Sequence, residues 1–442
     1  MLAQLAAFVS IESPSLDKAA LDRMGAALRA ALRPLGAQVR IDEQAETGNN
    51  IVAAWPGADG STQGGFVIMC HFDTVHPVGM LAENPVRMAD GWMYGPGIID
   101  MKSSLTQVLF ALRALREQQR WPARPVTLLL TSDEEVGSNS SRPLITSLGA
   151  AAGLVLCMEP ALPDGALKTA RKGIGGFTVT AHGRAAHAGA DHANGVNAIA
   201  EMAQQVQALQ ALTDYPRGTT VSTGIVRGGT RSNVVPDECT VEVDFRVETE
   251  AEGARVTAAV NGLQPQLKGA RLEVSGGLER PPMPRSPAIA AAFERARSIA
   301  QALQLELREG STGGGSDANL VAPYGVAMLV GGSGCGEGAR SNLQAATPEG
   351  GARSASIVRR RRNLVAVRSA ARVVVARSRP SALPASRRAS LPSSRVADPP
   401  APVGLQPGCR GVRVEGQGRR GAGAVRYASD TASTGPRTYF NA

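Results

Sequence analysis

Two short segments of the sequence carry histidine or aspartate side chains that could serve a metal site. His71 and Asp73 stand two residues apart in HFDTV, directly after the apolar run GFVIMC, so both project from the same face of a strand. An imidazole can ligate a metal while a nearby carboxylate holds its second nitrogen. Asp100 stands in GPGIIDMKS, just before a predicted helix. Each segment also has a simpler interpretation, as a polar strand end or as a helix N-cap.

Two further acidic segments extend the pattern. Adjacent Glu134 and Glu135 stand in TSDEEVGS, where they could form an ordinary solvated loop or divide the work of a metal ligand and a general base. Glu159 follows the apolar run GLVLCM. The four segments all fall at the carboxyl ends of predicted strands, where open α/β sheets place their sites. One imidazole with several carboxylates suits Zn²⁺ or a similar divalent ion.

The elements that must position these residues alternate between buried strands and helices. Leu21, Met24, Leu28 and Leu32 recur at helical spacing after Ser15, which we expect to cap that helix, and another helix begins near Lys102. The predicted buried strands are NIVAAW (50–55), GFVIMC (65–70), PVTLLLTS (125–132) and GLVLCM (153–158). This alternation predicts an α/β domain with a largely parallel sheet.

A second pattern follows between residues 175 and 275. Its predicted order is β-α-β-β-α-β, the split pattern of a small ferredoxin-like domain. A helix over 287–303 and a strand over 325–332 then return to the first pattern. The predicted catalytic domain consists of two parts, residues 1–170 and 282–340. The inserted domain lies between them, at 171–281, and a basic tail follows at 341–442.

The motifs HFDTV, GPGIIDMKS, DEEVGS and MEP, in this order, resemble those of the co-catalytic zinc exopeptidases and amidohydrolases. That family includes glutamate carboxypeptidase, acetylornithine deacetylase and succinyl-diaminopimelate desuccinylase, and the first is the most similar in appearance. GRAAHAG, RSNVVPDECTVEVDFR and STGGGSDAN extend the resemblance over roughly residues 8–339. It implies a zinc-exopeptidase-like catalytic domain with an inserted dimerisation domain.

The resemblance also implies roles for the acidic residues and His71. Asp100 would bridge two zinc ions in each subunit. His71 and Glu159 would complete the ligands of one ion, and Glu135 would ligate the other. Asp73 would orient His71. Glu134 would be the general base that takes a proton from water and passes it to the leaving amine.

Three residues of the inserted domain resemble the substrate-binding positions of the family. His187 in RAAHAG matches a histidine that helps to hold the tetrahedral oxyanion, often across a dimer interface, although a surface-loop histidine is the alternative. Asn233 and Arg246 match positions that bind the terminal carboxylate of the substrate, a task that suits a forked guanidinium. Arg246 could equally form a salt bridge on the face of a strand.

One ligand of the family is missing from this sequence. The family carries a late histidine in a G-x-G-x-H-S turn, whereas the matching turn here is GEGARS, with Arg340 at the histidine position. All five histidines lie at or before His192, so none remains to replace it. Arginine stays protonated and offers no lone pair to a metal. We therefore expect the zinc ion held by Asp100 and Glu135 to bind weakly or not at all, and the chain to be impaired.

The sequence from 341 to 442 differs in composition from the rest. It holds 18 arginines, no lysine and four acidic residues, a charge of +14, which leaves −5 of the total +9 for residues 1–340. Such an Arg-, Ala-, Ser- and Pro-rich segment is typical of disorder. Three interpretations stay open: a disordered tail that binds nucleic acid or acidic surfaces, an ordinary disordered extension, or out-of-frame translation of a GC-rich gene, which we favour because the change falls inside a motif.

These observations favour a zinc-dependent hydrolase that cleaves a peptide or N-acyl amide bond next to a free carboxylate, as glutamate carboxypeptidase does. The alternatives are an N-acyl amino acid deacylase of the acetylornithine or succinyl-diaminopimelate type, or an inactive relative that binds. We expect a homodimer formed by the inserted domain, no membrane partner, and nucleic acid only through the tail. Five scattered cysteines, no run of 18 apolar residues and no signal-peptide pattern favour the cytoplasm.

Overall fold

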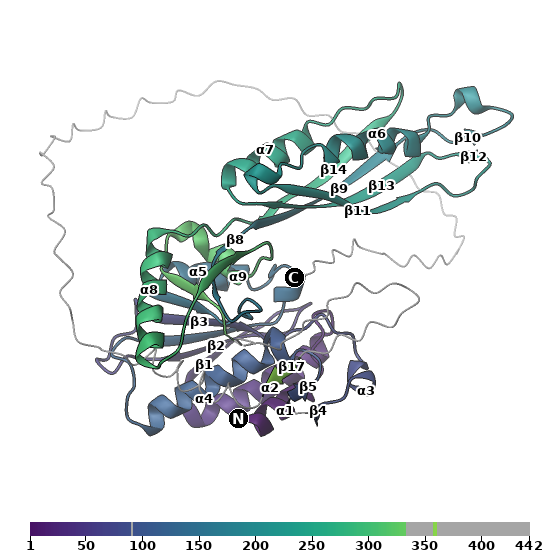
Figure 1. Ribbon diagram of the computed structural model, residues 1–442. Helices are drawn as coiled ribbons and strands as arrows, with labels where there is room; N and C mark the ends of the chain where they lie inside the picture. Colours follow the sequence, from purple (N-terminus) through teal and green to yellow (C-terminus); the bar gives the residue numbers. More distant parts are fainter. Residues whose placement is uncertain (90–91, 333–356, 360–442) are drawn as a thin grey trace, which may run out of the picture. The chain divides into compact units, whose positions relative to one another are not determined.

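The computed structural model describes residues 1–89, 92–332 and 357–359 (Figure 1). Arg340 and almost all of the basic tail lie outside the described residues. The described residues all lie within a single compact unit of the chain. In the described part of the chain, no helix is both long and apolar enough to span a membrane.

The catalytic region is built on an eight-stranded sheet in which four of the seven strand pairs are parallel. Its strands, in spatial order, are β1 (Gln38–Asp42), β2 (Asn50–Trp55), β6 (Val126–Thr131), β3 (Phe66–His71), β7 (Leu154–Cys157), β16 (Met328–Val330), β8 (Leu167–Arg171) and β15 (Glu309–Thr312). The central strands are almost entirely buried, which explains their continuous apolar runs.

Helices cover both faces of this sheet (Figure 1). On one face α2 (Lys18–Leu32) and α4 (Ser103–Glu117) bury Leu21 and Leu105 against Ile68 and Leu128. On the other face α5 (Arg142–Ala150), α8 (Pro287–Ala302) and α9 (Asp317–Val321) pack on Val67 and Val155. The expected α/β domain with a mostly parallel sheet is thereby confirmed.

Smaller elements complete the catalytic region. Helix α1 (Leu2–Val9) packs on Ile98 in a separate apolar cluster, and α3 (Met80–Glu83) is a single turn. Strands β4 (Arg87–Ala89), β5 (Trp92–Tyr94) and β17 (Ile357–Arg359) form a short sheet. The predicted cap of α2 was wrong: the carboxylate of Asp17 accepts from the amide of Ala20 at 2.9 Å, whereas Ser15 donates to Asp73.

The inserted region forms its own four-stranded antiparallel sheet in the order β11-β13-β9-β14. Its elements along the chain are β9 (Gly173–His182), α6 (Ala198–Gln210), β11 (Thr220–Gly228), β13 (Glu238–Val247), α7 (Glu250–Asn261) and β14 (Arg271–Arg280). Met202 of α6 and Val256 of α7 pack on Phe177, Val179 and Val241 of the sheet. The expected ferredoxin-like βαββαβ unit is thus confirmed, and the domain boundaries stay a prediction.

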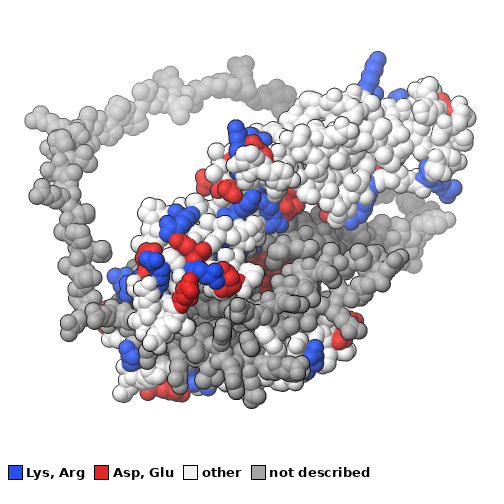
Figure 2. Space-filling model, viewed as in Figure 1, with Lys and Arg blue, Asp and Glu red and all other residues white. Residues whose placement is uncertain are grey.

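A two-stranded ribbon extends this unit beyond the end of β9. It consists of β10 (Ala186–His187) and β12 (Val234–Val235), which pair antiparallel. Figure 2 shows mostly uncharged side chains over the inserted unit and mixed charges over the catalytic side near α8. Ile199 of α6 and Val226 of β11 are exposed apolar side chains of the inserted unit.

Candidate metal centre

Three neighbouring parallel strands deliver most of the predicted ligands to one edge of the sheet. His71 is the last residue of β3, Glu134 and Glu135 lie in the helical turn Glu134–Val136 after β6, and Glu159 follows β7. Because β6, β3 and β7 are adjacent and parallel, their carboxyl ends meet. Asp100 arrives from the turn Ile98–Lys102, directly before α4.

Short distances join these side chains around the imidazole of His71. Its Nε2 lies 3.0 Å from Oδ1 of Asp100 and 3.5 Å from Oε1 of Glu159. Two sets of possible ligand atoms each lie within 4.8 Å of one another: one from His71, Glu134 and Glu159, and one from His71, Asp100 and Glu135. Asp100 therefore does not act as the N-cap of α4, because its carboxylate faces the imidazole.

Asp73 holds two of the ligand segments together. It is fully buried, and its Oδ1 lies 3.3 Å from Nδ1 of His71. Its carboxylate also accepts from the hydroxyl of Ser15 at 2.8 Å and from the backbone amides of Glu134 and Glu135 at 3.2 and 3.1 Å. With Nδ1 held on this side, the other ring nitrogen faces the cluster, which is the orientation that a metal-binding imidazole needs.

The charges of the cluster fit a divalent cation. Burial raises the pKa of Glu134 to about 8, although the charge of Arg280 acts in the opposite direction. Burial and the charge of Asp100 raise the pKa of Glu135 well above its usual range. Crowded buried carboxylates resist ionisation unless a cation shares their space. Their oxygens and one imidazole nitrogen are the donor set that zinc accepts.

His71 supplies positive charge to this cluster. Burial acts to lower its pKa, but hydrogen bonds to Asp100, Asp73 and Glu159 outweigh burial and raise the pKa well above the usual value. Burial likewise acts to raise the pKa of Glu159, but the hydrogen bond and charge of His71 and the charge of Arg171 lower it to about 2. A metal ion would replace the His71 proton, because an imidazole must be neutral to ligate.

Arg280 braces the turn that carries Glu134. This buried residue ends β14, and its guanidinium lies 3.1 Å from Oε1 of Glu134 and 3.0 Å from Oδ1 of Asp317. It also donates to the backbone carbonyl of Glu134 at 3.0 Å and to the hydroxyl of Ser138 at 2.8 Å. The end of the inserted sheet is thereby tied to the predicted general base.

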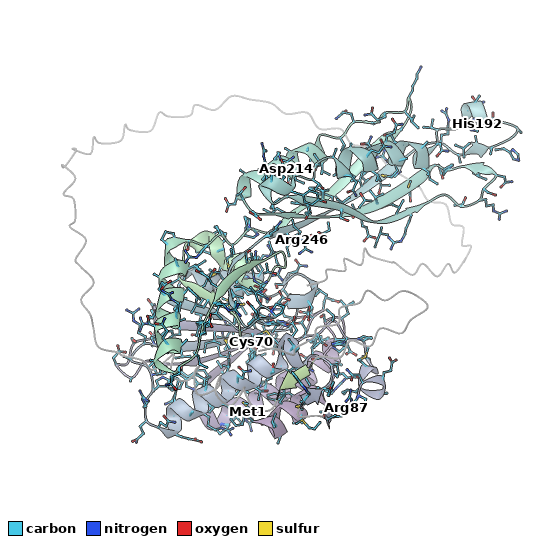
Figure 3. All side chains as sticks on the ribbon, in the orientation of Figure 1. Met1, Cys70, Arg87, His192, Asp214 and Arg246 are labelled. Atoms are coloured by element: carbon cyan, nitrogen blue, oxygen red, sulfur yellow. The ribbon has the colours of Figure 1, made fainter. Side chains whose placement is uncertain are left out.

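The three predicted residues of the inserted domain are not brought to one place within a chain. His187 and Asn233 are exposed on the β10–β12 ribbon, where the amide of Ala188 donates to the carbonyl of Asn233. Arg246 lies at the other end of β13 and pairs with Ile174, whereas Glu238 pairs with His182. The eight-residue span from 174 to 182 corresponds to about 26 Å. Figure 3 shows Arg246 and His192 at opposite ends of this unit.

Arg246 already has an acidic partner on its own strand. Its guanidinium meets the carboxylate of Asp244 with three contacts of 2.8–3.1 Å, and its Nη1 donates to the carbonyl of Gly313 at 3.4 Å. This is the strand-face salt bridge that the sequence left open as an alternative. A substrate carboxylate would have to share or displace Asp244.

Sequence reasoning missed the residues that surround the cluster. Arg171, Arg280 and Asp317 stand in ARKG, ERPPM and GGGSDAN, and no role was expected for them. Their backbone segments meet only in the folded chain, where the side chain of Asn319 donates to the carbonyls of Lys172 and Pro281 at 3.0 and 2.8 Å. The signal that the sequence offered is that Arg171 and Arg280 lie close to the two points where the chain passes between the catalytic and inserted domains.

Two family models match adjacent parts of the chain: peptidase family M28 over residues 50–169, and the peptidase dimerisation domain of the M20 type over residues 169–266. Carboxypeptidase G2 of Pseudomonas sp. (strain RS-16) is 31% identical over 330 residues, which cover 73% of this chain and 78% of that protein. The chain belongs to the M20/M28 metallopeptidases. The expected family and enzyme class, a metallopeptidase or amidohydrolase, are thus confirmed.

Other relatives carry different names. Succinyl-diaminopimelate desuccinylase of Dinoroseobacter shibae is 29% identical over 298 residues, which cover 62% of this chain and 76% of that protein. A probable carboxypeptidase of Trichophyton verrucosum is 28% identical, and the match covers 54% of its length. These M20/M28 relatives support a metallohydrolase with carboxypeptidase or acyl-amino-acid hydrolase activity.

Solved structures agree with this fold. An M20 family metallo-carboxypeptidase from Sulfolobus solfataricus superposes with a TM-score of 0.65 at 15% identity, covering 84% of this chain and 98% of that chain. A tripeptidase from Staphylococcus aureus gives 0.66 at 20% identity, covering 84% and 96%. The family implies a divalent metal, and the M20 dimerisation model suggests a homodimer.

Proposed function

We propose that this chain is a zinc-dependent amidase that cleaves a peptide or N-acyl bond next to a free carboxylate, in the manner of a glutamate carboxypeptidase. The observation that carries the proposal is the convergence of His71, Asp100, Glu134, Glu135 and Glu159 at one sheet edge. The relatives named carboxypeptidase support the choice of a C-terminal amide.

The ligand assignment is the one that the family resemblance implies, whereas the donor atoms that lie within 4.8 Å of one another are those of His71, Glu134 and Glu159 and those of His71, Asp100 and Glu135. His71, Asp100 and Glu159 would hold one zinc ion, and Asp100 and Glu135 would hold a second. The chemistry that zinc supplies when bound is the polarisation of a carbonyl and a lower pKa for water. The first set includes an imidazole and is the better donor set among the described residues.

Glu134 carries the proton transfers. Its carboxylate takes a proton from the attacking water as the new carbon–oxygen bond forms. The same proton passes to the amide nitrogen as the carbon–nitrogen bond breaks, so that a carboxylic acid and an amine leave. Burial raises the pKa of Glu134, so its carboxylate, once ionised, is a stronger base than an exposed one.

The inserted unit would contribute recognition through a dimer. Because His187 and Asn233 lie far along the sheet from Arg246, we propose that they serve the site of a partner subunit. The exposed apolar side chains Ile199 and Val226 would lie at that interface. Arg246 would bind the substrate carboxylate at the site of its own chain.

Arg340 sets the expected level of activity. It lies outside the described residues, and the proposal follows from its place in GEGARS. We propose that the chain holds one zinc ion firmly and the second weakly, and that turnover is impaired. We also expect the cytoplasm as its location.

Amide hydrolysis with added zinc tests the proposal. An N-acyl-L-glutamate, an N-acetylornithine and an N-succinyl-diaminopimelate are offered to the unsubstituted chain, to R340H and to E134Q. We expect slow release from the N-acylglutamate, at least about 10–100-fold faster release by R340H, and none by E134Q. Preference for another acyl substrate would favour a deacylase. Zinc binding without turnover in both the unsubstituted chain and R340H would favour an inactive binding relative.

A further inference from the structure

Arg171 is a buried arginine whose side chain is only partly satisfied. It ends β8 and is 4% exposed. Its backbone amide and carbonyl pair with those of Met283 at 2.9 and 3.0 Å, so its position is fixed against the segment that returns from the inserted unit. Arginines are rarely this buried unless they are paired.

The two sides of its guanidinium have different surroundings. Nη1 donates to the carbonyl of Gly314 at 3.1 Å and to the carbonyl of Gly315. Among the described residues, Nε and Nη2 have no hydrogen-bond partner, and Nη2 lies 3.7 Å from Oε2 of Glu159. That distance is too long for a hydrogen bond but short enough for a strong charge attraction in a buried place.

Glu159 lies between two cations. Its Oε1 lies 3.5 Å from Nε2 of His71, and its Oε2 lies 3.7 Å from Nη2 of Arg171. The guanidinium thus attracts the oxygen that is not directed at the imidazole. Oε1 therefore points into the cluster, as the oxygen of a metal ligand would have to.

The Gly-rich loop explains how Arg171 keeps this place. The carbonyls of Gly314 and Gly315 hold Nη1, so the guanidinium cannot rotate away from Glu159 without losing both bonds. A Cβ atom at Gly315 would clash with the side chain of Ile174. The motif STGGGSDAN therefore has a physical task here, which is to anchor this arginine.

We propose that Arg171 is a positioning residue that holds Glu159 in place as a metal ligand. The inference rests on the proposed function, because it assumes that Glu159 ligates zinc. Removing Arg171 would leave Glu159 free to turn, and would leave it among Asp100 and Glu134 without its second cation. Loss of such an outer partner typically weakens metal binding by about 10–100-fold.

Zinc titration of the full chain against a competing chelator tests this. We expect R171M to bind the first zinc ion about 10–100-fold more weakly than the unsubstituted chain, and R171K to recover part of the loss. R308M is the matched control, because Arg308 is an exposed arginine paired with Asp164, and its zinc affinity should not change. Circular dichroism establishes that each variant is folded.

A double-mutant cycle separates positioning from general damage to the fold. In an E159Q background, R171M should weaken zinc binding by less than about twofold further, because the residue it positions is already gone. Full additivity of the two losses would overturn the proposal. So would unchanged zinc affinity in R171M with a raised KM, which would mean that the open edge of Arg171 binds the substrate instead. If the unsubstituted chain bound no zinc, the proposed function itself would fail.

Discussion

The predicted site residues fall into two regions of the molecule that differ in how they are held. The catalytic region brings six of them, His71 to Glu159, into one largely buried cluster with contacts of 3.0–3.5 Å. In the inserted unit His187 and Asn233 are exposed, and Arg246 forms a salt bridge with Asp244. The first group is organised by the packing of its own chain, whereas the second needs another molecule, a substrate or a partner subunit, to become a site.

The largest effect should come from the proposed general base. In an R340H chain, E134Q should lower kcat by about 10²–10⁴-fold, because the amide cannot accept the proton from water. Zinc binding should persist, since Glu134 is not among the proposed ligands. Steady-state hydrolysis with a parallel zinc titration measures both. An E134Q variant that kept more than half of kcat would remove Glu134 from its role.

Removing His187 of the inserted unit should lower kcat almost as much, and mixing two inactive variants should restore part of the activity. H187A in the R340H chain should lose about 10²–10³-fold in kcat, as expected for an oxyanion donor. Equal amounts of inactive H187A and E134Q chains, unfolded together and refolded at random, should recover about a quarter of the activity, because half of the dimers are then mixed and one of the two sites in each mixed dimer is complete. No recovery, with mixed dimers shown to form, would contradict a shared site.

Asp73 should affect zinc binding and stability together. D73N keeps the size of the side chain but replaces an acceptor oxygen with an amide that faces other donors. We expect zinc affinity to fall by about 10–100-fold and the free energy of unfolding to fall by about 1–3 kcal/mol. Zinc titration and urea unfolding measure the two. S10A, at an exposed hydroxyl that donates to the carbonyl of Ala6 in α1, is the control for small polar changes.

The convergence of His71, Glu134, Glu135 and Glu159 could be expected because each follows a buried apolar strand, whereas Asp100 comes from the turn before α4. Strand ends are readable from composition, and parallel neighbours place those ends together. Ser15 was misassigned because Asp17, two residues later, offers a carboxylate at the start of α2, while the hydroxyl of Ser15 is needed by Asp73.

The supporting residues could not be read in the same way. Arg171 contacts the carbonyls of Gly314 and Gly315 and the carboxylate of Glu159, and Arg280 contacts the carbonyl of Glu134. Apart from Glu159, these partners lie 143–146 positions away along the chain, and hydrophobic periodicity in the sequence does not reveal such long-range contacts. The separation of His187 from Arg246 depends on the register of β9 and β13. Pairing register is a tertiary property, so motif matching alone could not show how far apart the two residues lie within one chain.

The smallest effect concerns the inserted unit alone. Buried Glu252 accepts from Arg255, from Thr219 at 2.7 Å and from Arg217 at 3.2 Å, and these hydrogen bonds lower its pKa from 4.5 to about 2. Its contribution to stability is therefore present above pH 4.5 and is lost as the pH falls toward 2. E252Q should be less stable by about 1–3 kcal/mol at pH 7, with a smaller difference at pH 3. Urea unfolding at both pH values checks this, and a constant difference would contradict it.

Anomalous scattering at the zinc edge, from crystals of the full chain grown with zinc, tests the central claim most directly. We predict a strong zinc peak within bonding distance of His71, Asp100 and Glu159, and a weak peak or none between Asp100 and Glu135. A zinc peak elsewhere, with no density among His71, Asp100 and Glu159, would contradict the account.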